Sequence, residues 1–590
     1  MRKKRFKKVL ATLTGMAMAL SLSACQGDVK EDAGTGQANG EVGEDQAAKE
    51  DGAHDAPEPG GEGEIVTLTC YFQNGNNGVE RYPWFEKYLG EKFGLYLESR
   101  VQSADSSLLA PMLASGELTD IIQIGNKTDV ANAVAGDMLL DLEEYREQLP
   151  HIFGNEKYQS AIQYAKDTFG GLYMMPLLIG ESGGIGIDPQ MRWDLYKELG
   201  MPEIPDMDSL LDVLKQMQEL EPETAEGLPV YGLGAFNDWD GNGVMYCAFA
   251  NYMVYRGFAM EGFSWLAYLK NDGSGDVKYL LDDDSVYKEA LQWFFRANQL
   301  GLLDPESATM NYEGYTAKAG NAQYLSTVWD WFSYGDPDAE NGEEWWGHAS
   351  VWPEDVEVPV SSETPVGASN CIGISSKCAD VDKALAFLDW YYSEEGLDLL
   401  FNGPEGMLWE YDDSGKRILS DLYYENDYLG NPYQHPDGGN VNNLREFYFD
   451  IAVWPTATAE HGQRYELETD SYACVKHTKS KLKEDFTENN GGYASRYERA
   501  EAEGKNLIVT SPVLSFVAPA PDDIEEIRGQ IGEIVVQNSW KMVYARDQEE
   551  FDALWAQTQA DAEALGAEQV FADAVARWEE AVKVSEKYLK

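Results

Sequence analysis

The sequence predicts an α/β fold built as two lobes, with additional helices at the C-terminal end. Three observations support this prediction. Short strand-like runs alternate with amphipathic helices from residue 65 onward. The chain from residue 65 to residue 590 is longer than the roughly 250–300 residues that one hydrophobic core usually serves. From residue 522 the pattern is helical almost throughout.

The first 64 residues stand apart from this fold. MRKKRFKK and the apolar stretch after it predict a lipoprotein signal peptide over 1–24. Leu22-Ser23-Ala24-Cys25 matches a lipobox, so we expect Cys25 to carry lipid, palmitate included, and to anchor the protein on the extracellular face of the cell membrane. An ordinary cleavable signal with an accidental cysteine is the alternative. Residues 25–64, rich in Gly, Ala, Asp and Glu, predict a disordered acidic tether.

The first part of the body alternates strands and helices. We expect a strand at 65–72, a helix at about 84–93, a strand at 95–102, a helix that stops at Gly116 and a strand at 120–126. This alternation predicts a parallel sheet, whose ligands collect in the loops that follow its strands. Those loops are 73–79 and 125–129.

Helix signals dominate the remainder of the chain. Asp206 or Asp208 is expected to cap a helix after Pro205. Further helices are predicted at 284–301, at 378–396 with Gly396 as the closing residue, and at 524–545 and 551–566.

Charge and aromatic content restrict the ligand. The formal net charge of −58 argues against binding nucleic acid and favours a neutral ligand. The 16 tryptophans and 34 tyrosines suit the gripping of sugar rings, although they also suit hydrophobic cores.

Cysteine and histidine spacing indicates neither a disulfide scaffold nor a metal site. The six cysteines contain no CxxC pair; Cys70 and Cys371 are expected in the core, and Cys371 could bridge to Cys378 or remain free. Asp238-x-Asp240-x-Asn242-Gly243 matches the first half of a calcium loop, but position twelve is Phe249, so a solvated turn or a ligand loop is favoured over calcium. We expect no metal and no cofactor.

Several segments, in order, resemble the extracellular solute-binding lipoproteins of ABC sugar importers, in the long Gram-positive branch of the maltodextrin-type family 1 group. The segments that carry the resemblance are MLASGELTDIIQIG (112–125), GDMLLDLEEY (136–145), LYMMP (172–176), MRWDLYKELGMPEIPDMDSLLDVL (191–214), NQLGLLDPE (298–306), KAGNAQYLSTVWDW (318–331) and KALAFLDWYYSEEG (383–396).

The resemblance implies a periplasmic-binding-protein-like fold of type II, in which hinges join two α/β lobes and the ligand is held in the cleft between them. It implies lobe 1 at 65–175 and 367–405 and lobe 2 at 176–366 and 406–590. Hinge crossings would fall near Met175, Pro365–Ser369 and Gly403–Gly406. The protein would act as a monomer that delivers a neutral carbohydrate, such as an oligosaccharide, to membrane permease subunits.

Candidate ligand residues come from the resemblance and from loop positions. The resemblance sets Trp329 and Trp331 at the cleft, where tryptophan can stack on sugar, although alternate residues of a strand also face a core. The other candidates lie in loops or follow the hinge and could bind hydroxyls or serve only as turn or core residues: Trp239, Asp238, Asn74, Asn76, Asn126, Glu181, Trp409 and Trp454.

Two other functions remain open at this point. A binder of another solute, such as a peptide, would share the same fold. An exported glycoside hydrolase would need two suitably spaced carboxylates, and the abundance of acidic residues makes such pairs uninformative. The sequence shows no nucleophile elbow, HExxH or P-loop pattern, so we predict a binding protein and not an enzyme.

Overall fold

The structure is a computed structural model. It describes residues 65–72, 82–99, 108–181, 188–237, 249–259, 266–327, 335, 346–360, 363–367, 370–426, 433–441, 444, 451–470, 473–474 and 481–589. All of them belong to one unit of the chain, residues 56–590.

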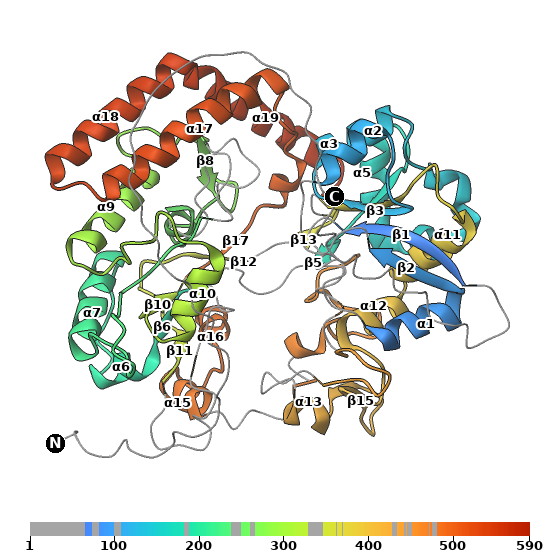
Figure 1. Ribbon diagram of the computed structural model, residues 1–590, viewed down its shortest axis with the longest axis horizontal. Coiled ribbons are helices and arrows are strands. Elements are labelled where there is room, and N and C mark those ends of the chain that lie inside the picture. The colour runs from blue at the N-terminus through green and yellow to red at the C-terminus, as the bar shows by residue number, and fades with distance from the viewer. Residues whose placement is uncertain are drawn as a thin grey trace, which may run out of the picture. The chain divides into compact units, whose positions relative to one another are not determined.

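A five-stranded sheet forms the centre of lobe 1 (Figure 1). Its order is β2-β1-β3-β14-β4. The strands are β1 (Val66–Phe72), β2 (Leu95–Ser99), β3 (Ile121–Ile124), β4 (Met174–Pro176) and β14 (Cys371–Ile374). β1 runs parallel to β2 and β3, as predicted, whereas β14 runs antiparallel to both β3 and β4. The prediction of a parallel sheet is therefore confirmed for β1, β2 and β3 and wrong for the pairings of β14, a strand from far along the chain that completes the sheet.

Both faces of this sheet are buried. Leu68, Cys70 and Phe72 enter one core, while Tyr71 enters another, as side-chain alternation along a strand requires. The helices that surround the sheet are α1 (Pro83–Phe93), α2 (Leu109–Ser115), α3 (Lys127–Ala135), α4 (Pro150–Gly154), α5 (Gln159–Phe169), α11 (Val381–Tyr391) and α12 (Glu394–Asn402), with 3₁₀ turns at Leu142–Gln148 and Glu156–Tyr158.

Helix ends follow the predicted signals in most places. α2 stops at Gly116 in the left-handed conformation, and Asp206 caps the helix after Pro205 by accepting from the Ser209 N–H. Gly396 is an exception, because α11 ends at Tyr391 and Gly396 lies inside α12. The Ser393 side chain accepts from the Gly396 N–H and starts the new helix there.

The lobe 1 core that contains Leu68, Cys70 and Phe72 also includes side chains from residues 451–465. Ile451, Val453 and Tyr465 pack with the side chains around β1 and α11. The division of the lobes at residue 406 remains a prediction, and this packing favours counting the segment with lobe 1. A smaller cluster beside it contains β15 (Trp409–Tyr411), β16 (Arg417–Leu419) and α13 (Asp421–Glu425), with a 3₁₀ turn at Leu467–Thr469.

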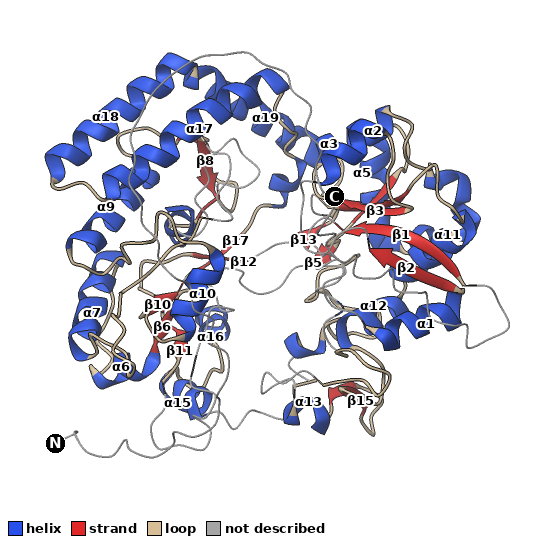
Figure 2. Cartoon of the chain, viewed as in Figure 1, coloured by secondary structure: helices blue, strands red, loops and turns tan. Residues whose placement is uncertain are grey.

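Lobe 2 is mainly helical, and its strands are short (Figure 2). Its sheet has the order β10-β6-β11, with both pairings antiparallel. Its strands are β6 (Gln190–Arg192), β10 (Ser326–Thr327) and β11 (His348–Ser350). Lobe 2 also contains a separate meander of β7 (Phe258–Ala259), β8 (Ala267–Lys270) and β9 (Lys278–Tyr279). A further parallel pair is formed by β12 (Val358–Val360) and β17 (Leu507–Val509).

One large core holds the helices of lobe 2 together. These helices are α6 (Trp193–Glu198), α7 (Met207–Leu220), α8 (Asn251–Tyr255), α9 (Val286–Gln299), α10 (Tyr312–Gly320), α15 (Lys481–Asn489), α16 (Arg496–Glu503), α17 (Asp522–Val543), α18 (Gln548–Leu565) and α19 (Ala567–Ser585), with a 3₁₀ turn at Pro512–Phe516. The predicted C-terminal helices are confirmed, and α17 packs against α9 and α18 (Figure 1).

One strand pair lies close to the predicted hinge crossings, and one group of contacts joins lobe 2 to lobe 1. The short strands β5 (Gly180–Glu181) and β13 (Glu363–Thr364) pair antiparallel beside the lobe 1 sheet. Beyond α19, Lys587 and Tyr588 both bond to Asp167 on α5. None of the described helices is long and apolar enough to cross a membrane.

The described cysteines carry free thiols. Cys70 and Cys371 are buried in lobe 1, as predicted for core residues, and burial raises the pKa of the Cys371 thiol to about 12. Cys378 is also free, so the alternative of a bridge from Cys371 is not formed.

Candidate functional site

The predicted lipidation and ligand residues fall into two groups. Seven lie outside the described residues: Cys25, Asn74, Asn76, Asp238, Trp239, Trp329 and Trp331. Asn126, Glu181, Trp409 and Trp454 are described.

Asn126 serves as a helix cap. Its side-chain oxygen accepts from the Asp129 N–H at 2.8 Å, and its Nδ2 donates to the Asp129 carboxylate at 2.7 Å. The residue therefore fixes the start of α3 directly after β3. Both amide atoms already bond to Asp129 on the helix, so fewer of the hydrogen-bonding positions of the amide are left for a ligand.

Trp409 is a core residue of the small cluster around β15. Its side chain is 5% exposed, and its indole N–H donates to the Gly403 carbonyl at 2.9 Å. Its ring also lies 5.5 Å from that of Tyr411, measured between centroids. These contacts account for Trp409 by packing.

Glu181 and Trp454 come together at the strand pair β5–β13. The Trp454 indole N–H donates to Thr364 Oγ1 at 2.7 Å, and that hydroxyl donates to the Leu178 carbonyl at 2.7 Å. Thr364 pairs with Gly180 in the strand register, so Trp454 lies beside the residue that precedes Glu181. We name Glu181, Thr364 and Trp454 the hinge group. Glu181 is exposed and Trp454 is half-buried, so both have surface that a ligand can reach.

A second polar group lies at the end of the lobe 2 sheet. Asp188 Oδ1 accepts from the Ser350 hydroxyl and from the Trp352 indole N–H, both at 2.5 Å. Ser350 pairs with Gln190 in the register, so this edge is where the chain enters β6 after residue 181. Glu181 and Asp188 are seven positions apart along the chain, a span of at most about 25 Å.

Helix α16 adds Arg496 and Tyr497 to this edge. The Arg496 guanidinium lies over the Trp352 ring, 5.6 Å from its centroid. Burial raises the pKa of Tyr497, and the carboxylates of Glu501 and Glu181 raise it further. We name Asp188, Ser350, Trp352 and Arg496 the edge group.

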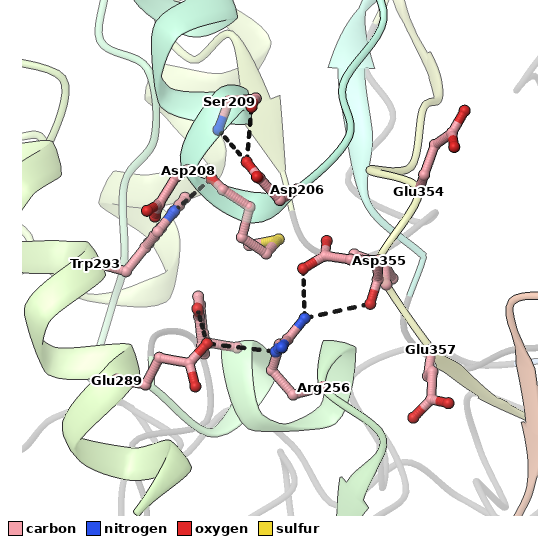
Figure 3. Close-up of polar contacts among 12 residues, drawn as sticks. Asp206, Asp208, Ser209, Arg256, Glu289, Trp293, Glu354, Asp355 and Glu357 are labelled. Atoms are coloured by element: carbon pink, nitrogen blue, oxygen red, sulfur yellow. Dashed lines mark hydrogen bonds and ion pairs between the residues drawn. The ribbon is translucent and has the colours of Figure 1, made fainter. Parts of the chain in front are cut away.

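A separate cavity of 620 Å³ lies between α8, α9 and the segment 354–357. Figure 3 shows Arg256 between two carboxylates: its Nη1 contacts Asp355 Oδ2 at 2.5 Å, and its Nε lies 3.4 Å from Glu289 Oε1. Lys270 bonds to Glu357 at 2.7 Å. These charges pair with each other, which makes the cavity a weaker candidate for a neutral ligand. Among the residues described, no cluster of His, Cys, Asp and Glu could hold a metal ion.

Sequence reasoning missed the edge group and Thr364. One signal was available: Trp352-Pro353 follows a short strand just as Trp454-Pro455 follows a short apolar run. No sequence pattern marked Arg496, because its contact with Trp352 forms only when segments that are distant in the sequence meet in the fold.

A fold of two α/β lobes, with polar and aromatic side chains where their segments meet, defines a ligand-binding protein of the solute-receptor class. The family profile described as bacterial extracellular solute-binding protein matches residues 77–398. The chain belongs to this family; it is an extracellular binding protein and not an enzyme.

Solved structures show the same fold. An HMO-binding, ABC-transporter-associated solute-binding protein from Bifidobacterium longum infantis is 16% identical with a TM-score of 0.56, covering 88% of this chain and 99% of its own. The S. pneumoniae ABC-transporter substrate-binding protein FusA with kestose is 15% identical with a TM-score of 0.54, covering 87% and 99%. An alginate-binding protein solved without calcium ion is 16% identical with a TM-score of 0.52, covering 88% and 98%. Comparison with curated protein sequences gave no match.

Proposed function

We propose that this protein is the substrate-binding component of an ABC-type importer. It captures a neutral carbohydrate, an oligosaccharide, in a cleft between the two lobes and delivers it to permease subunits in the membrane. The observation that carries the proposal is the family match over residues 77–398. The carbohydrate class is supported by proteins of the same fold, which are named as HMO-binding, kestose-bound and alginate-binding.

The chemistry of the described side chains suits a sugar. Trp454 offers a half-buried aromatic face whose indole N–H is already bonded, so the ring is held in place. Glu181 offers carboxylate acceptors for hydroxyls. The undescribed Trp239, Trp329, Trp331, Asp238, Asn74 and Asn76 remain proposed ligand residues, with Asn126 and Trp409 as weaker candidates because of their structural bonds.

Location forms part of the proposal. A lipid on Cys25 and the tether 25–64 would keep the binder near its permease on the outer face of the membrane. Substitution C25S is expected to release the protein into the medium, and mass spectrometry of the wild-type N-terminal peptide is expected to show the lipid. A membrane-bound C25S protein would contradict the anchor.

Binding is tested with the chain from Gln26 onward. Neutral oligosaccharides of several linkages, acidic oligosaccharides and peptides are titrated in a calorimeter, and tryptophan fluorescence and product chromatography run in parallel. We expect saturable binding of at least one neutral glycan, without new products. Binding of peptides but of no glycan would refute the carbohydrate class, and turnover would refute the binding role.

A further inference from the structure

The C-terminal end of the chain packs against lobe 1 through three aromatic rings. Tyr164 on α5 contacts both Phe516 and Tyr588 edge to face, with the ring centroids 5.3 Å apart in each pair. Phe516 and Tyr588 also stack on each other, with their centroids 5.6 Å apart. Edge-to-face and stacked pairs at such distances are arrangements that aromatic rings favour. Each ring therefore contacts the other two, and one of the three belongs to lobe 1.

Polar contacts surround these rings. The Tyr588 hydroxyl donates to Asp167 Oδ2 at 2.5 Å, and Lys587 forms an ion pair with the same carboxylate. Lys127, at the start of α3, donates to the Ser515 carbonyl at 2.8 Å. The pair of Lys587 with Asp167 is largely exposed and contributes little, so the rings supply most of the attachment. Two helices of lobe 1 are thus attached to the C-terminal part of the chain.

The rings cover a predicted hinge crossing. Val366 belongs to the segment 365–369, where the chain is expected to pass between the lobes, and it packs in one apolar cluster with Phe516 and Ala581. The exposed fractions of these side chains are 2%, 3% and 1%. β13, just before Val366, also contacts the 3₁₀ turn at Pro512–Phe516. The cluster therefore adjoins the hinge group. We give the name clasp to Tyr164, Val366, Phe516 and Tyr588.

The clasp borders an open space. A hollow of 630 Å³ lies between α5 and α19, and its wall includes Tyr164, Phe516 and Tyr588 together with Arg577 and Glu580 further back on α19. A few side chains at the end of the helix therefore carry the contact with α5. Such a contact can persist while the lobes turn, because groups close to a rotation axis move little.

We propose that the clasp restrains the hinge: it limits how widely the ligand-free lobes separate and thereby increases the affinity for the ligand. Because the clasp adjoins the hinge, it need not break when the lobes close. Without it a wider range of arrangements becomes accessible, and restricting that range on binding costs free energy. The apparent Kd then rises as the population that is competent to bind falls. This inference rests on the proposed function and on the predicted hinge crossing.

The test removes the ring of Tyr588. For a neutral glycan that the wild type binds, Y588A is expected to raise Kd by about 5-fold or more, the lower end of coupling between distant parts of a protein. Y588F keeps the ring and loses only the bond to Asp167. V582A is the matched control, because Val582 lies on the same helix and is 38% exposed. Both controls should leave Kd within about twofold of the wild type, as for surface substitutions.

Small-angle X-ray scattering measures the restraint without any ligand. Ligand-free Y588A is expected to have a larger radius of gyration than the wild type, Y588F and V582A, because its lobes separate over a wider range. Saturation with the glycan should make the radii of all four proteins equal. Circular dichroism and a single cooperative melting transition establish that a larger radius does not come from unfolding.

Stopped-flow tryptophan fluorescence separates restraint from damage to the bound state. Because the clasp acts on the population that is competent to bind, kon should fall by the factor by which Kd rises, with koff unchanged. A rise in koff in place of a fall in kon would overturn the proposal. If Y588A is not folded, V584A replaces it, because Val584 packs against the same cluster whereas Val582 is exposed.

The outcomes distinguish the clasp from the proposed function. Equal Kd values for Y588A and the wild type, or tighter binding by Y588A, would overturn the clasp and leave the proposed function standing. An effect of V582A as large as that of Y588A would also overturn it, since the effect would then not depend on the ring. If the wild type binds no glycan, the proposed function fails, and the scattering of the ligand-free proteins still decides whether the clasp restrains the lobes.

Discussion

The bond between Trp454 and Thr364 gives a sharp test of the hinge group. Substitution T364V keeps the shape of the side chain but removes the acceptor of the Trp454 indole N–H and the donor to the Leu178 carbonyl. Two partly buried polar groups then lose their partner, and each such loss costs about 1–3 kcal/mol when water cannot replace it. Because both groups are only half-buried, we expect T364V to lower the free energy of unfolding by about 1–2 kcal/mol.

A double-mutant cycle isolates the bond itself. W454F alone removes the donor, with an expected loss of about 1 kcal/mol, and the double variant W454F/T364V should lose less than the sum of the two single losses by about 1 kcal/mol. Urea unfolding followed by circular dichroism measures all four proteins. The control is T309V, since the Thr309 hydroxyl is exposed and bonds only to the nearby Glu306 carbonyl. A loss for T309V within about 0.5 kcal/mol is expected.

Additivity would refute this reasoning. If the two single losses sum to the double loss within about 0.3 kcal/mol, the indole–hydroxyl bond contributes nothing and the hinge group is not a coupled unit. The same four proteins can be titrated with ligand, because altered pairing of β5 with β13 should change affinity along with stability.

Three further predictions concern contacts elsewhere in the fold. In D167N the ion pair with Lys587 is lost; since this pair lowers the pKa of Asp167 to about 2, its contribution is present above about pH 4 and fades as pH falls towards 2. The free energy of unfolding of D167N should differ from that of the wild type by less than about 1 kcal/mol at pH 7, and the difference should shrink towards pH 2, where about half of Asp167 is still ionised; an undiminished difference at pH 2 would contradict the assignment. R192M leaves the carboxylates around the fully buried Arg192 unpaired and should cost about 3–5 kcal/mol in the same assay; a loss below about 1 kcal/mol would show that they remain hydrated. G396A places a methyl group 2.0 Å from a backbone carbonyl of α11 and should lower the free energy of unfolding by about 1–3 kcal/mol. G529A, with open space around it, should instead stabilise α17 by about 0.5–1 kcal/mol. Similar effects of the two substitutions would contradict the packing around Gly396.

Local signals predicted the elements that are set by neighbouring residues. The helix expected at 84–93 is observed as Pro83–Phe93, and the first three strands of lobe 1 form in the expected order. Gly116 and Asp206 act at helix ends because backbone conformation and capping depend only on a few adjacent residues. Periodicity and capping therefore sufficed for the α/β class.

Features that depend on distant packing were not predictable. Gly396 is a different case: it is predicted as the end of the helix at 378–396, although Ser393, followed by Glu394 and Glu395, is a local signal for the start of α12. Asn126 has the same local setting as a ligand residue, yet its amide caps α3. The edge group could not be derived, because Arg496 and Trp352 are 144 positions apart and meet only through the pairing of β17 with β12.

The place of β14 in the lobe 1 sheet has a consequence for how the protein reaches its folded state. Cys371 pairs with Ile124 on one side and with Pro176 on the other, so the sheet closes only after the first segment of lobe 2, residues 176–366, has been synthesised. Until then β3 and β4 present open edges, which are sites of mispairing and aggregation. Closing such long loops slows folding. A chain that crosses a membrane before it folds benefits from this delay, because lobe 1 stays incomplete during passage and becomes complete once the late strand emerges.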